Sequence, residues 1–274
     1  TYVEPFVGGG ATVFYIMNKY PNIKRAIIND INARLITTYR VVKSRPDDLI
    51  KELSALQKKY IPLNHEDRTA MYIEQRHKFN DDELTDVQIA SLFIFLNRTC
   101  FNGLYRENSK GKFNVPHGKY VNPLICDKAT ILADSEILQR VDILCGDYSE
   151  TIKYAGDDTL YYFDPPYKPL SETSSFNSYV KEVFDDNEQI RLRDFCNSVS
   201  AFGSSFILSN SDVKGKKKED DFFDVLYAAY DINRVFANRM VNANSKKRGK
   251  LSELLISNIV EIQTPVGLQV EFIL

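Results

Sequence analysis

Residues 1–19 have the sequence TYVEPFVGGGATVFYIMNK. A short apolar run from Thr1 to Phe6 is followed by three glycines and by helical spacing from Ala11 to about Lys19. This order predicts a strand, a tight turn and a helix. A second short strand, Ile27 to Asp30, precedes another helical period from Ala33 to Val42. Because strands alternate with helices, we expect an α/β fold with a parallel sheet.

The middle of the chain differs in pattern from its two ends. Between residues 46 and 139, helical spacing leads into a polar, Gly- and Asn-rich loop from Asn97 to Pro123, and strand-like runs then return. We therefore expect residues 1–45 and 140–274 to form the sheet domain and residues 46–139 to be an inserted, mostly helical domain. The expected helices are 47–60, 67–79, 83–98 and 187–199, and the expected later strands are 141–145, 159–163, 205–208 and 254–259, with an extra strand over 266–274.

Composition places the chain among soluble globular proteins. It has 274 residues, of which 43% are hydrophobic and 26% charged, so disorder and a small disulfide scaffold are excluded. The chain has 35 Lys and Arg residues and 37 Asp and Glu residues, which gives a net charge of -2. A nucleic-acid partner must therefore be bound by local basic patches. No apolar run reaches membrane length and no signal pattern is present, so we expect a cytoplasmic protein.

The cysteines and histidines do not suggest a metal site. Cys100, Cys126, Cys145 and Cys196 lie far apart, with no Cys-x-x-Cys pair, and the three histidines share no metal spacing with them. We expect four reduced thiols and no bound metal.

The glycine cluster, Gly8 to Gly10, suits a nucleoside-bearing cofactor. Glycine allows a sharp turn and close approach of a ligand, and the following helix presents free N–H groups. The spacing is neither Gly-x-Gly-x-x-Gly nor a phosphate-gripping loop. Asp30 could accept ribose hydroxyls, and Asp147 could bind an adenine amino group. A plain turn, with Asp30 capping the next helix, stays open as the alternative. The candidate cofactor residues are Glu4, Pro5, Phe6, Gly8, Gly9, Gly10, Asp30, Asp147 and Tyr148.

A second motif, Asp164-Pro165-Pro166-Tyr167, directly follows the expected strand 159–163. Two successive prolines stiffen the turn, so a carboxylate and a carbonyl are held in fixed positions beside an aromatic ring. The Asp164 carboxylate and the Pro165 carbonyl could accept both N–H groups of a nucleobase amine and turn its lone pair toward an electrophile, while Tyr167 stacks on the base. The alternative is an ordinary edge turn. These four residues are the candidate catalytic residues.

Several segments together resemble the DNA adenine-N6 methyltransferases of the Dam type, which include GATC-modifying enzymes of restriction-modification systems. The resemblance runs from Tyr2 to about Asn258. It implies a Rossmann-like sheet that binds S-adenosylmethionine, an inserted DNA-recognition domain, and double-stranded DNA as substrate. The matching segments are Glu4 to Gly10, Asn29 to Asn32, Phe101 to Arg106, Phe113 to Tyr120, Asp164 to Tyr167, Pro169 to Thr173, Leu208 to Asn210 and Arg248 to Leu254.

The same resemblance assigns roles in DNA recognition. It implies that the target adenine is flipped out of the duplex, that Phe101 enters the space left behind, and that Asn102 lies beside the orphan thymine. Arg106 would bond guanine, and Leu104 and Pro116 would contact the thymine methyl, so we expect a GATC site. A solvated loop is the alternative for residues 97–120. The candidate DNA-binding residues are Phe101, Asn102, Gly103, Leu104, Arg106, Asn114, Pro116, Tyr120, Lys246, Lys247 and Arg248.

Two departures leave alternatives open. Related enzymes carry a Trp-x-Gly-Gly-Lys segment ahead of the glycine cluster, whereas this sequence has no Trp and starts at Thr1, so we expect a trimmed N-terminus. Residues 260–274 extend past the resemblance and have no assigned role. A non-catalytic DNA-binding relic, or an N-methyltransferase acting on RNA or on protein glutamine, therefore remains an alternative. We expect a monomer, and a cognate restriction endonuclease acting separately is an open partner.

Overall fold

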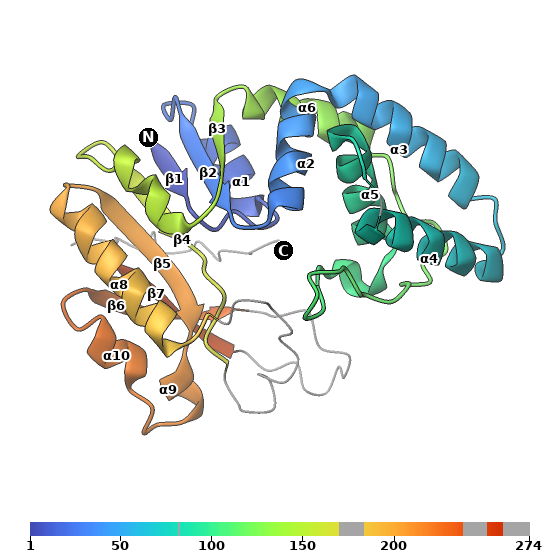
Figure 1. Ribbon diagram of the computed structural model, residues 1–274. Helices are drawn as coiled ribbons and strands as arrows, with labels where there is room; N and C mark the ends of the chain where they lie inside the picture. The colour runs from blue at the N-terminus through green and yellow to red at the C-terminus, as the bar shows by residue number, and fades with distance from the viewer. Residues whose placement is uncertain (82, 170–183, 238–250, 260–274) are drawn as a thin grey trace. The chain divides into compact units, whose positions relative to one another are not determined.

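The computed structural model describes residues 1–81, 83–169, 184–237 and 251–259 (Figure 1). Within this part of the chain, a mixed sheet of seven strands has the order β3-β2-β1-β4-β5-β7-β6. An α/β fold is therefore confirmed. The strands are β1 (Tyr2–Glu4), β2 (Ala26–Asp30), β3 (Val141–Cys145), β4 (Leu160–Phe163), β5 (Ser205–Ser211), β6 (Asp231–Ala237) and β7 (Leu251–Ser257).

The strand directions bring two sequence motifs to one edge of the sheet. β1 runs parallel to β2 on one side and to β4 on the other, and β4 runs parallel to β5. The carboxyl ends of β1, β4 and β5 consequently lie at the same edge. The chain order reverses between β1 and β4, which is where α/β proteins place their ligands. β7, however, is antiparallel to both β5 and β6. The sheet is therefore mixed, whereas the sequence predicted a parallel sheet.

The described residues divide into two compact units. Unit 1 holds residues 1–29, 147–169, 184–237 and 251–259, and unit 2 holds residues 30–81 and 83–146. The insertion expected over residues 46–139 falls within the sequence range of unit 2, and its boundaries stay a prediction.

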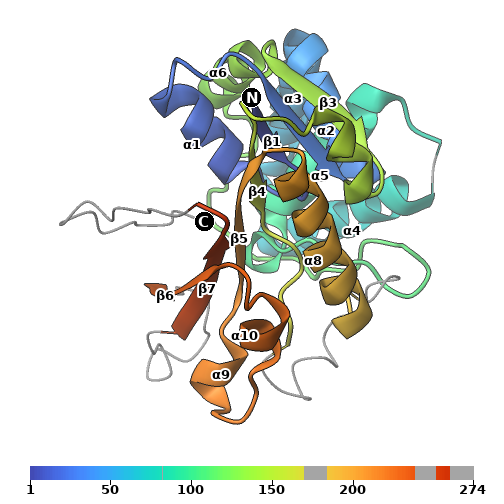
Figure 2. The same cartoon turned by 90° about the vertical axis from the view of Figure 1, so that its left-hand side faces the viewer.

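Unit 1 contains the helices that flank the central strands. They are α1 (Ala11–Lys19), η2 (Tyr148–Tyr154), α8 (Asp186–Ala201), α9 (Val213–Lys216) and α10 (Phe222–Leu226). α8 packs along β5 (Figure 2) and buries Leu192, Phe195 and Val199 at helical spacing. Phe195 meets the ring of Phe163 on β4 at 6.0 Å between centroids. These aromatic contacts fix the carboxyl end of β4 against α8.

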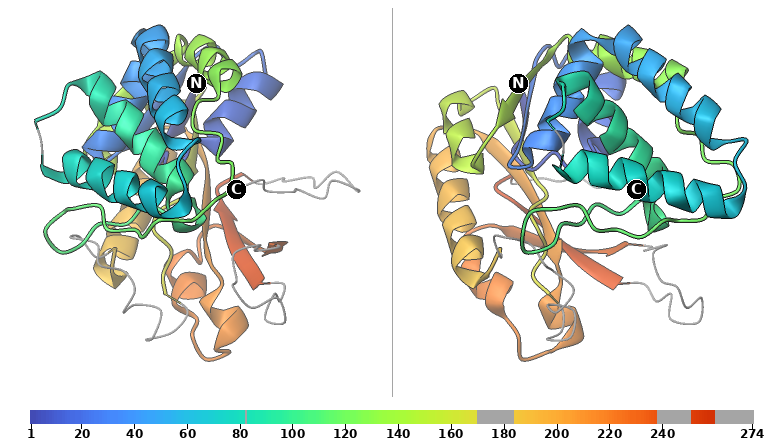
Figure 3. Two further views of the ribbon diagram at one scale, coloured as in Figure 1. Left: turned by 90° about the vertical axis from the view of Figure 1, so that its right-hand side faces the viewer. Right: turned by 45° about the vertical axis from the view of Figure 1, so that its right-hand side comes forward.

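Unit 2 is mostly helical. Its helices are α2 (Ala33–Ser44), α3 (Pro46–Tyr60), α4 (His65–Asp81), α5 (Asp86–Thr99), η1 (Phe101–Gly103) and α6 (Lys128–Leu138). α5 packs against α2, α3 and α4, and an irregular segment follows it beside α4 (Figure 3). Thr85 and Gln88 form a capping box that starts α5. Its buried face includes Leu92, Phe95 and Leu96, so α5 is the central helix of this unit.

Most of the expected elements are present, and several observed elements were not anticipated. Helix 11–19 and strand 141–145 are found at the expected residues, and the other helices shift by a few residues at their ends. The expected strand 1–6 is only Tyr2–Glu4, because the chain turns at Pro5. α6 and β6 were not expected from the sequence. The strand expected over 266–274 lies outside the described residues. No helix in the described part is long and apolar enough to cross a bilayer.

Candidate functional site

The Asp-Pro-Pro-Tyr turn leaves β4 at the carboxyl edge of the sheet. Asp164 is exposed, Pro165 is buried beneath it, Pro166 is exposed and Tyr167 is half-buried. Ser209 on the neighbouring strand β5 donates a hydrogen bond from Oγ to Asp164 Oδ1 at 2.7 Å. The carboxylate is therefore both accessible and oriented.

Ser209 also holds the aromatic residue of this turn. The Tyr167 hydroxyl makes a hydrogen bond with Ser209. Burial raises the pKa of Tyr167, and the charge of Asp164 adds to that shift. Tyr167 therefore stays a neutral phenol whose ring is fixed beside the carboxylate.

The backbone beyond the turn is clamped by a chain of amides. Gln189 of α8 donates from Nε2 to the Pro166 carbonyl at 3.2 Å, and Asn210 donates from Nδ2 to Gln189 Oε1 at 3.1 Å. Asn210 Oδ1 accepts the N–H of Lys168 at 3.1 Å. Gln189 and Asn210 are fully buried, so these bonds form in a region of low dielectric constant, where they rigidify the turn.

The glycine cluster follows β1, the strand next to β4. Gly8 and Gly10 have φ of +47° and +76°, a backbone conformation that favours glycine. Apart from the glycine and its two chain neighbours, no atom of the described residues lies within 4 Å of a Cβ built on Gly8 or Gly9. Pro5 lies buried ahead of the cluster, where its carbonyl accepts a bond from Asn29 Nδ2 at 3.0 Å. The α1 helix then begins with no side-chain cap, so the cluster offers open backbone beside a helix N-terminus.

Glu4 ends β1 as a buried acid. The Tyr2 hydroxyl donates to Glu4 Oε2 at 2.9 Å, and the side chain is 3% exposed. Burial raises the pKa of Glu4 to about 8, and the negative charge of Asp164 adds to the increase, while the bond from Tyr2 opposes it. Glu4 is therefore mostly protonated at neutral pH in the free protein, and a cationic ligand group beside it would lower this pKa and favour the ionised form.

Aromatic residues form a second part of this edge. Phe6 lies 5.0 Å from the ring of Tyr148, and Tyr148 is buried with no hydrogen-bond partner for its hydroxyl among the described residues. Asp147 precedes it and pairs with Arg191 of α8 at 2.6 Å. Burial opposes ionisation of Asp147, but bonds from Arg191 and Ser149 outweigh it and lower the pKa. Asp147 is therefore an oriented carboxylate.

Asp30 belongs to unit 2, at the end of β2. Its Oδ1 accepts the N–H of Asn32 at 2.9 Å. Asn32, not Asp30, caps α2, because its side chain accepts the N–H groups of Arg34 and Leu35. The alternative of Asp30 as a helix cap is therefore wrong.

The candidate DNA-binding residues of unit 2 begin at η1. Phe101 is 47% exposed and Leu104 is 45% exposed. Asn102 and Gly103 have φ of 55° and 60°, so the chain turns sharply between them. The Asn102 N–H donates to the Tyr120 hydroxyl at 3.0 Å. Exposed apolar side chains are thus presented on a turn that its own hydrogen bonds fix.

A short hairpin, residues 106–114, follows η1 and brings Arg106 and Asn114 together. Arg106 Nε donates to Asn114 Oδ1 at 2.7 Å, and the Asn114 N–H donates to the Arg106 carbonyl at 3.0 Å. Arg106 is exposed. The exposed Pro116 follows, and its carbonyl accepts the Phe101 N–H at 2.9 Å. The hairpin thus presents a guanidinium whose orientation Asn114 sets.

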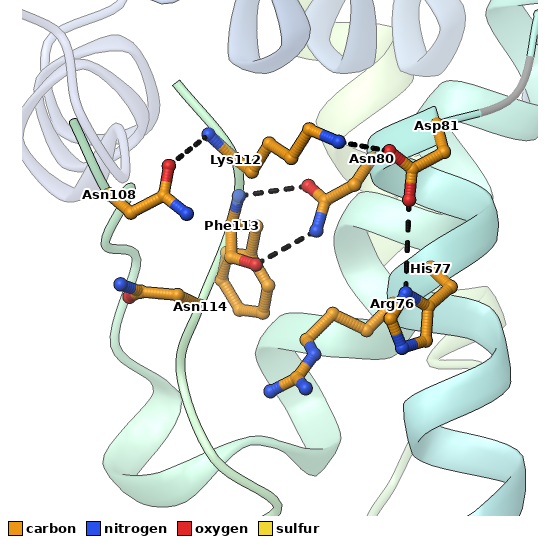
Figure 4. Close-up of a pocket in the computed structure, with 8 residues that line it drawn as sticks. All are labelled: Arg76, His77, Asn80, Asp81, Asn108, Lys112, Phe113 and Asn114. Atoms are coloured by element: carbon orange, nitrogen blue, oxygen red, sulfur yellow. Dashed lines mark hydrogen bonds and ion pairs between the residues drawn. The ribbon is translucent and has the colours of Figure 1, made fainter. Parts of the chain in front are cut away.

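Helix α4 lies beside the hairpin and contacts it through side chains (Figure 4). Asn80 makes two bonds to the backbone of Phe113: Oδ1 accepts the N–H at 2.8 Å and Nδ2 donates to the carbonyl at 2.9 Å. Lys112 pairs with Asp81 at the end of the same helix. These contacts border an open cavity of about 330 Å³ between α4 and the hairpin.

A comparison with known protein families decides the class of this chain. Residues 1–241 match the family described as D12 class N6 adenine-specific DNA methyltransferase. The chain belongs to this family. It is therefore an enzyme, an adenine-specific DNA methyltransferase, as the sequence resemblance predicted.

Curated relatives agree with membership of the D12 class. Type II methyltransferase M.MjaIII from Methanocaldococcus jannaschii is 46% identical over 260 residues, covering 94% of this chain and 88% of that protein. Type II methyltransferase M1.LlaDCHI from Lactococcus lactis subsp. cremoris is 38% identical, covering 94% and 86%. DNA adenine methylase of Escherichia coli K12 is 31% identical, covering 92% and 84%. The comparisons do not support the alternatives of an RNA or protein methyltransferase or a relic.

Three residues that support the candidate site were given no role in the sequence analysis. Ser209, Gln189 and Arg191 orient Asp164, Pro166 and Asp147 respectively. A sequence signal existed only for Ser209, which ends an apolar strand run with polar residues in the segment Leu208 to Asn210. All four cysteines are free thiols, as expected. The candidate residues Lys246, Lys247 and Arg248 lie outside the described residues.

Proposed function

We propose that this D12 methyltransferase transfers a methyl group from S-adenosylmethionine to adenine N6 in double-stranded DNA, within the site GATC. The observation that carries the proposal is the position of the Asp164 carboxylate, which is exposed and accepts a hydrogen bond from Ser209. It lies at the same sheet edge as Glu4, the last residue of β1, and the glycine cluster that follows.

The residues of unit 1 fit such a cofactor. Space beside Gly8 and Gly9 and the uncapped start of α1 suit the close approach of an amino-acid moiety. A cationic group of the cofactor beside Glu4 would favour ionisation of this buried carboxyl, and the neighbouring rings of Phe6 and Tyr148 suit an adenine. Asp147 would accept the adenine amino group. The ribose role of Asp30, a residue of unit 2, stays a prediction. When bound, the cofactor supplies an electrophilic methyl carbon on a sulfonium.

The turn after β4 would prepare the target amine for transfer. The amine of adenine is a poor nucleophile because its lone pair is delocalised into the ring. The Asp164 carboxylate and the Pro165 carbonyl accept its two N–H groups and turn the lone pair out of conjugation. Tyr167, fixed through Ser209, stacks on the base. The methylated amine is strongly acidic, so its proton leaves to water without a dedicated general base.

Access to N6 requires the adenine to leave the duplex, at a cost of a few kcal/mol. Stacking on Tyr167 and the bonds at Asp164 offset part of that cost. Phe101, exposed on η1, is the side chain that would enter the vacated space, with Asn102 beside the orphan thymine. The proposed sequence preference comes from Arg106, which would bond O6 and N7 of guanine, and from Leu104 and Pro116 against the thymine methyl.

Methylation of plasmid DNA tests the site preference. Plasmid incubated with enzyme and S-adenosylmethionine is digested with nucleases that differ only in tolerance of methylated GATC. We expect protection from the sensitive nuclease, and Arg106→Ala to lose roughly 1 to 3 kcal/mol of discrimination at the guanine. Unchanged digestion by active enzyme, with methyl groups found at another adenine site, would show that GATC is wrong.

The role of Asp164 is tested separately. We expect Asp164→Ala to lower the methyl-transfer rate by at least about 100-fold, because an oriented acceptor at the reacting amine is lost. Its DNA affinity should stay within about twofold of wild type, since Asp164 contacts only the flipped base. Radiolabelled methyl transfer and fluorescence anisotropy measure the two quantities. Near-normal turnover of Asp164→Ala would refute the assignment.

The partners of the enzyme follow the same proposal. Two relatives are named Type II methyltransferases, which supports a restriction-modification role with a cognate endonuclease that acts separately. A monomeric state and a cytoplasmic location stay predictions.

A further inference from the structure

His117, in the loop that returns from the hairpin, is held through both ring nitrogens. Nε2 lies 2.6 Å from the hydroxyl of Tyr60 on α3, and Nδ1 lies 3.0 Å from the hydroxyl of Thr69 on α4. The ring also packs on Tyr72, with centroids 5.1 Å apart. Side chains of two helices therefore hold His117 in place. The residue before it, Pro116, is a candidate base contact.

The neighbouring hydrogen bonds determine which ring nitrogen carries the proton. Thr69 Oγ1 donates its hydrogen to the His65 carbonyl at 3.0 Å. A hydroxyl has a single hydrogen, so Thr69 can only accept from His117, and Nδ1 must be the protonated nitrogen. Nε2 of the neutral ring is then an acceptor, and the Tyr60 hydroxyl donates to it. The four groups form one directed chain that requires neutral His117.

Adding a second proton would break this chain. The new Nε2–H would point at the Tyr60 hydroxyl, which is fully buried and has no other acceptor among the described residues. A buried donor left unpaired is costly. Burial, followed by the nearby His65, Lys119 and Arg68, lowers the pKa of His117. The groups facing the ring are Tyr60 from α3, His65, Arg68 and Tyr72 from α4, Cys100 at the end of α5 and Lys119 of the loop, and none is a carboxylate.

The His117 ring belongs to the segment Pro116 to Lys119, which packs against the start of η1. His117 pairs with Cys100 in an isolated antiparallel bridge. On either side of it, the Pro116 carbonyl accepts the Phe101 N–H at 2.9 Å and the Gly118 N–H donates to the Thr99 carbonyl at 2.8 Å. A Cβ on Gly118 would lie 2.3 Å from the Cys100 carbonyl oxygen, so the two segments are in close contact. The placement of Pro116 and Phe101 is thus coupled to the anchored ring of His117.

We propose that His117 is a positioning residue for DNA recognition, whose neutral ring fixes the segment from Pro116 to Lys119 against η1. Protonation of the ring releases this segment and lowers discrimination between the cognate site and an altered one. The inference rests on the proposed role of this loop in reading DNA.

Amide hydrogen exchange of the free enzyme tests the anchor without DNA. Exchange at Phe101 and Gly118, corrected for the intrinsic pH dependence, is compared between about pH 7.5 and about pH 5.5. We expect wild type to lose at least about tenfold protection at the lower pH. His117→Gln should show no such change, because a Gln carbonyl can accept from Tyr60 and does not titrate. His77→Gln, which alters an exposed histidine, should behave as wild type.

Two results would overturn the anchor. One is equal protection of wild type at both pH values, and the other is the same loss in His117→Gln as in wild type. Should His117→Gln fail to fold, Tyr60→Phe replaces it, since it removes the donor to Nε2 while keeping the ring. Tyr60→Phe should reduce protection already at the higher pH and show less than half of the wild-type pH effect.

A competition experiment then links the anchor to specificity. The ratio of kcat/KM for a GATC duplex to that for a duplex altered at the guanine is measured at the same two pH values. We expect this ratio to fall about tenfold in wild type on acidification and to stay constant in His117→Gln. A loss of protection with an unchanged ratio would overturn the role in recognition. If GATC is not methylated at either pH, the proposed site is wrong, and the exchange experiment alone decides the anchor.

Discussion

At the scale of single residues, Glu4 is a group whose charge near neutral pH depends on folding. Its folded pKa is about 8 because burial and the charge of Asp164 raise it above the ordinary value of 4.5. Ionisation therefore works against folding. The stability contributed by the protonated form is fully present below about pH 4.5 and is lost as the pH rises through about 8.

We expect Glu4→Gln to raise the free energy of unfolding by on the order of 2 to 3 kcal/mol at pH 8, and to leave it nearly unchanged at pH 4, because Gln never ionises. Urea denaturation at both pH values measures the difference. Glu150→Gln, at an exposed position of η2, is the control and should show no such pH-dependent gain. A gain of equal size at pH 4 and pH 8 would contradict the assigned cause.

The sequence could predict which residues end the strands but not which residues support them. The glycine cluster and the Asp-Pro-Pro-Tyr turn are local patterns, and their positions after β1 and β4 follow from the chain itself. Ser209 and Arg191 act across the fold, 45 and 44 residues away from Asp164 and Asp147 in sequence. Their roles depend on the strand order and on the packing of α8, which local patterns do not specify.

At the scale of secondary-structure elements, α4 determines where the hairpin lies. Asn80 matches both backbone groups of Phe113 in a part-buried contact, and Tyr72 and Arg76 donate to the Val115 carbonyl at 2.7 and 3.2 Å. One face of α4 thus replaces a neighbouring strand for the segment from Phe113 to Val115. Since Asn114 lies within this segment, the orientation of Arg106 depends on the helix.

We expect Asn80→Ala to lower the free energy of unfolding by about 1 to 2 kcal/mol, because two backbone groups lose their partner. It should also lower the preference for the cognate duplex, since Asn114 is no longer fixed. Asn64→Ala is the matched control. It removes a bond to the Asp67 N–H near the start of the same helix and should lower stability without altering preference. Equal preference in Asn80→Ala and wild type would show that α4 does not position the hairpin.

Two of the elements that were not anticipated from the sequence, α6 and β6, were missed for different reasons. α6 does carry a local signal, because Asp127 accepts the N–H of Thr130 and apolar residues follow at helical spacing. It was obscured by the long polar loop before it. β6 is an edge strand that pairs only with β7 among the named strands, and Arg234 interrupts its alternation. Arg234 is explained only by its ion pairs with Asp212 and Asp224, which the fold brings near.

At the scale of the whole molecule, the net charge of -2 contrasts with a polyanionic substrate. On the proposed function, cations of the candidate DNA-binding segment, residues 97–120, attract the phosphates. Lys110 and Lys119 are exposed there, at the hairpin tip and after His117. Such a distribution predicts DNA binding that is strongly salt-dependent despite a pI near 6.0.

The salt dependence of DNA affinity measures how many phosphate contacts the protein makes. Each phosphate contact that is removed should reduce the slope of log K against log salt by about 1. We therefore expect Lys110→Gln and Lys119→Gln each to reduce the slope by about that amount and to weaken cognate and altered duplexes equally. Fluorescence anisotropy between about 50 and 300 mM salt measures the slope. Lys24→Gln, at an exposed position between α1 and β2, is the control and should keep the wild-type slope. A wild-type slope in both loop variants would place the phosphate contacts elsewhere on the chain.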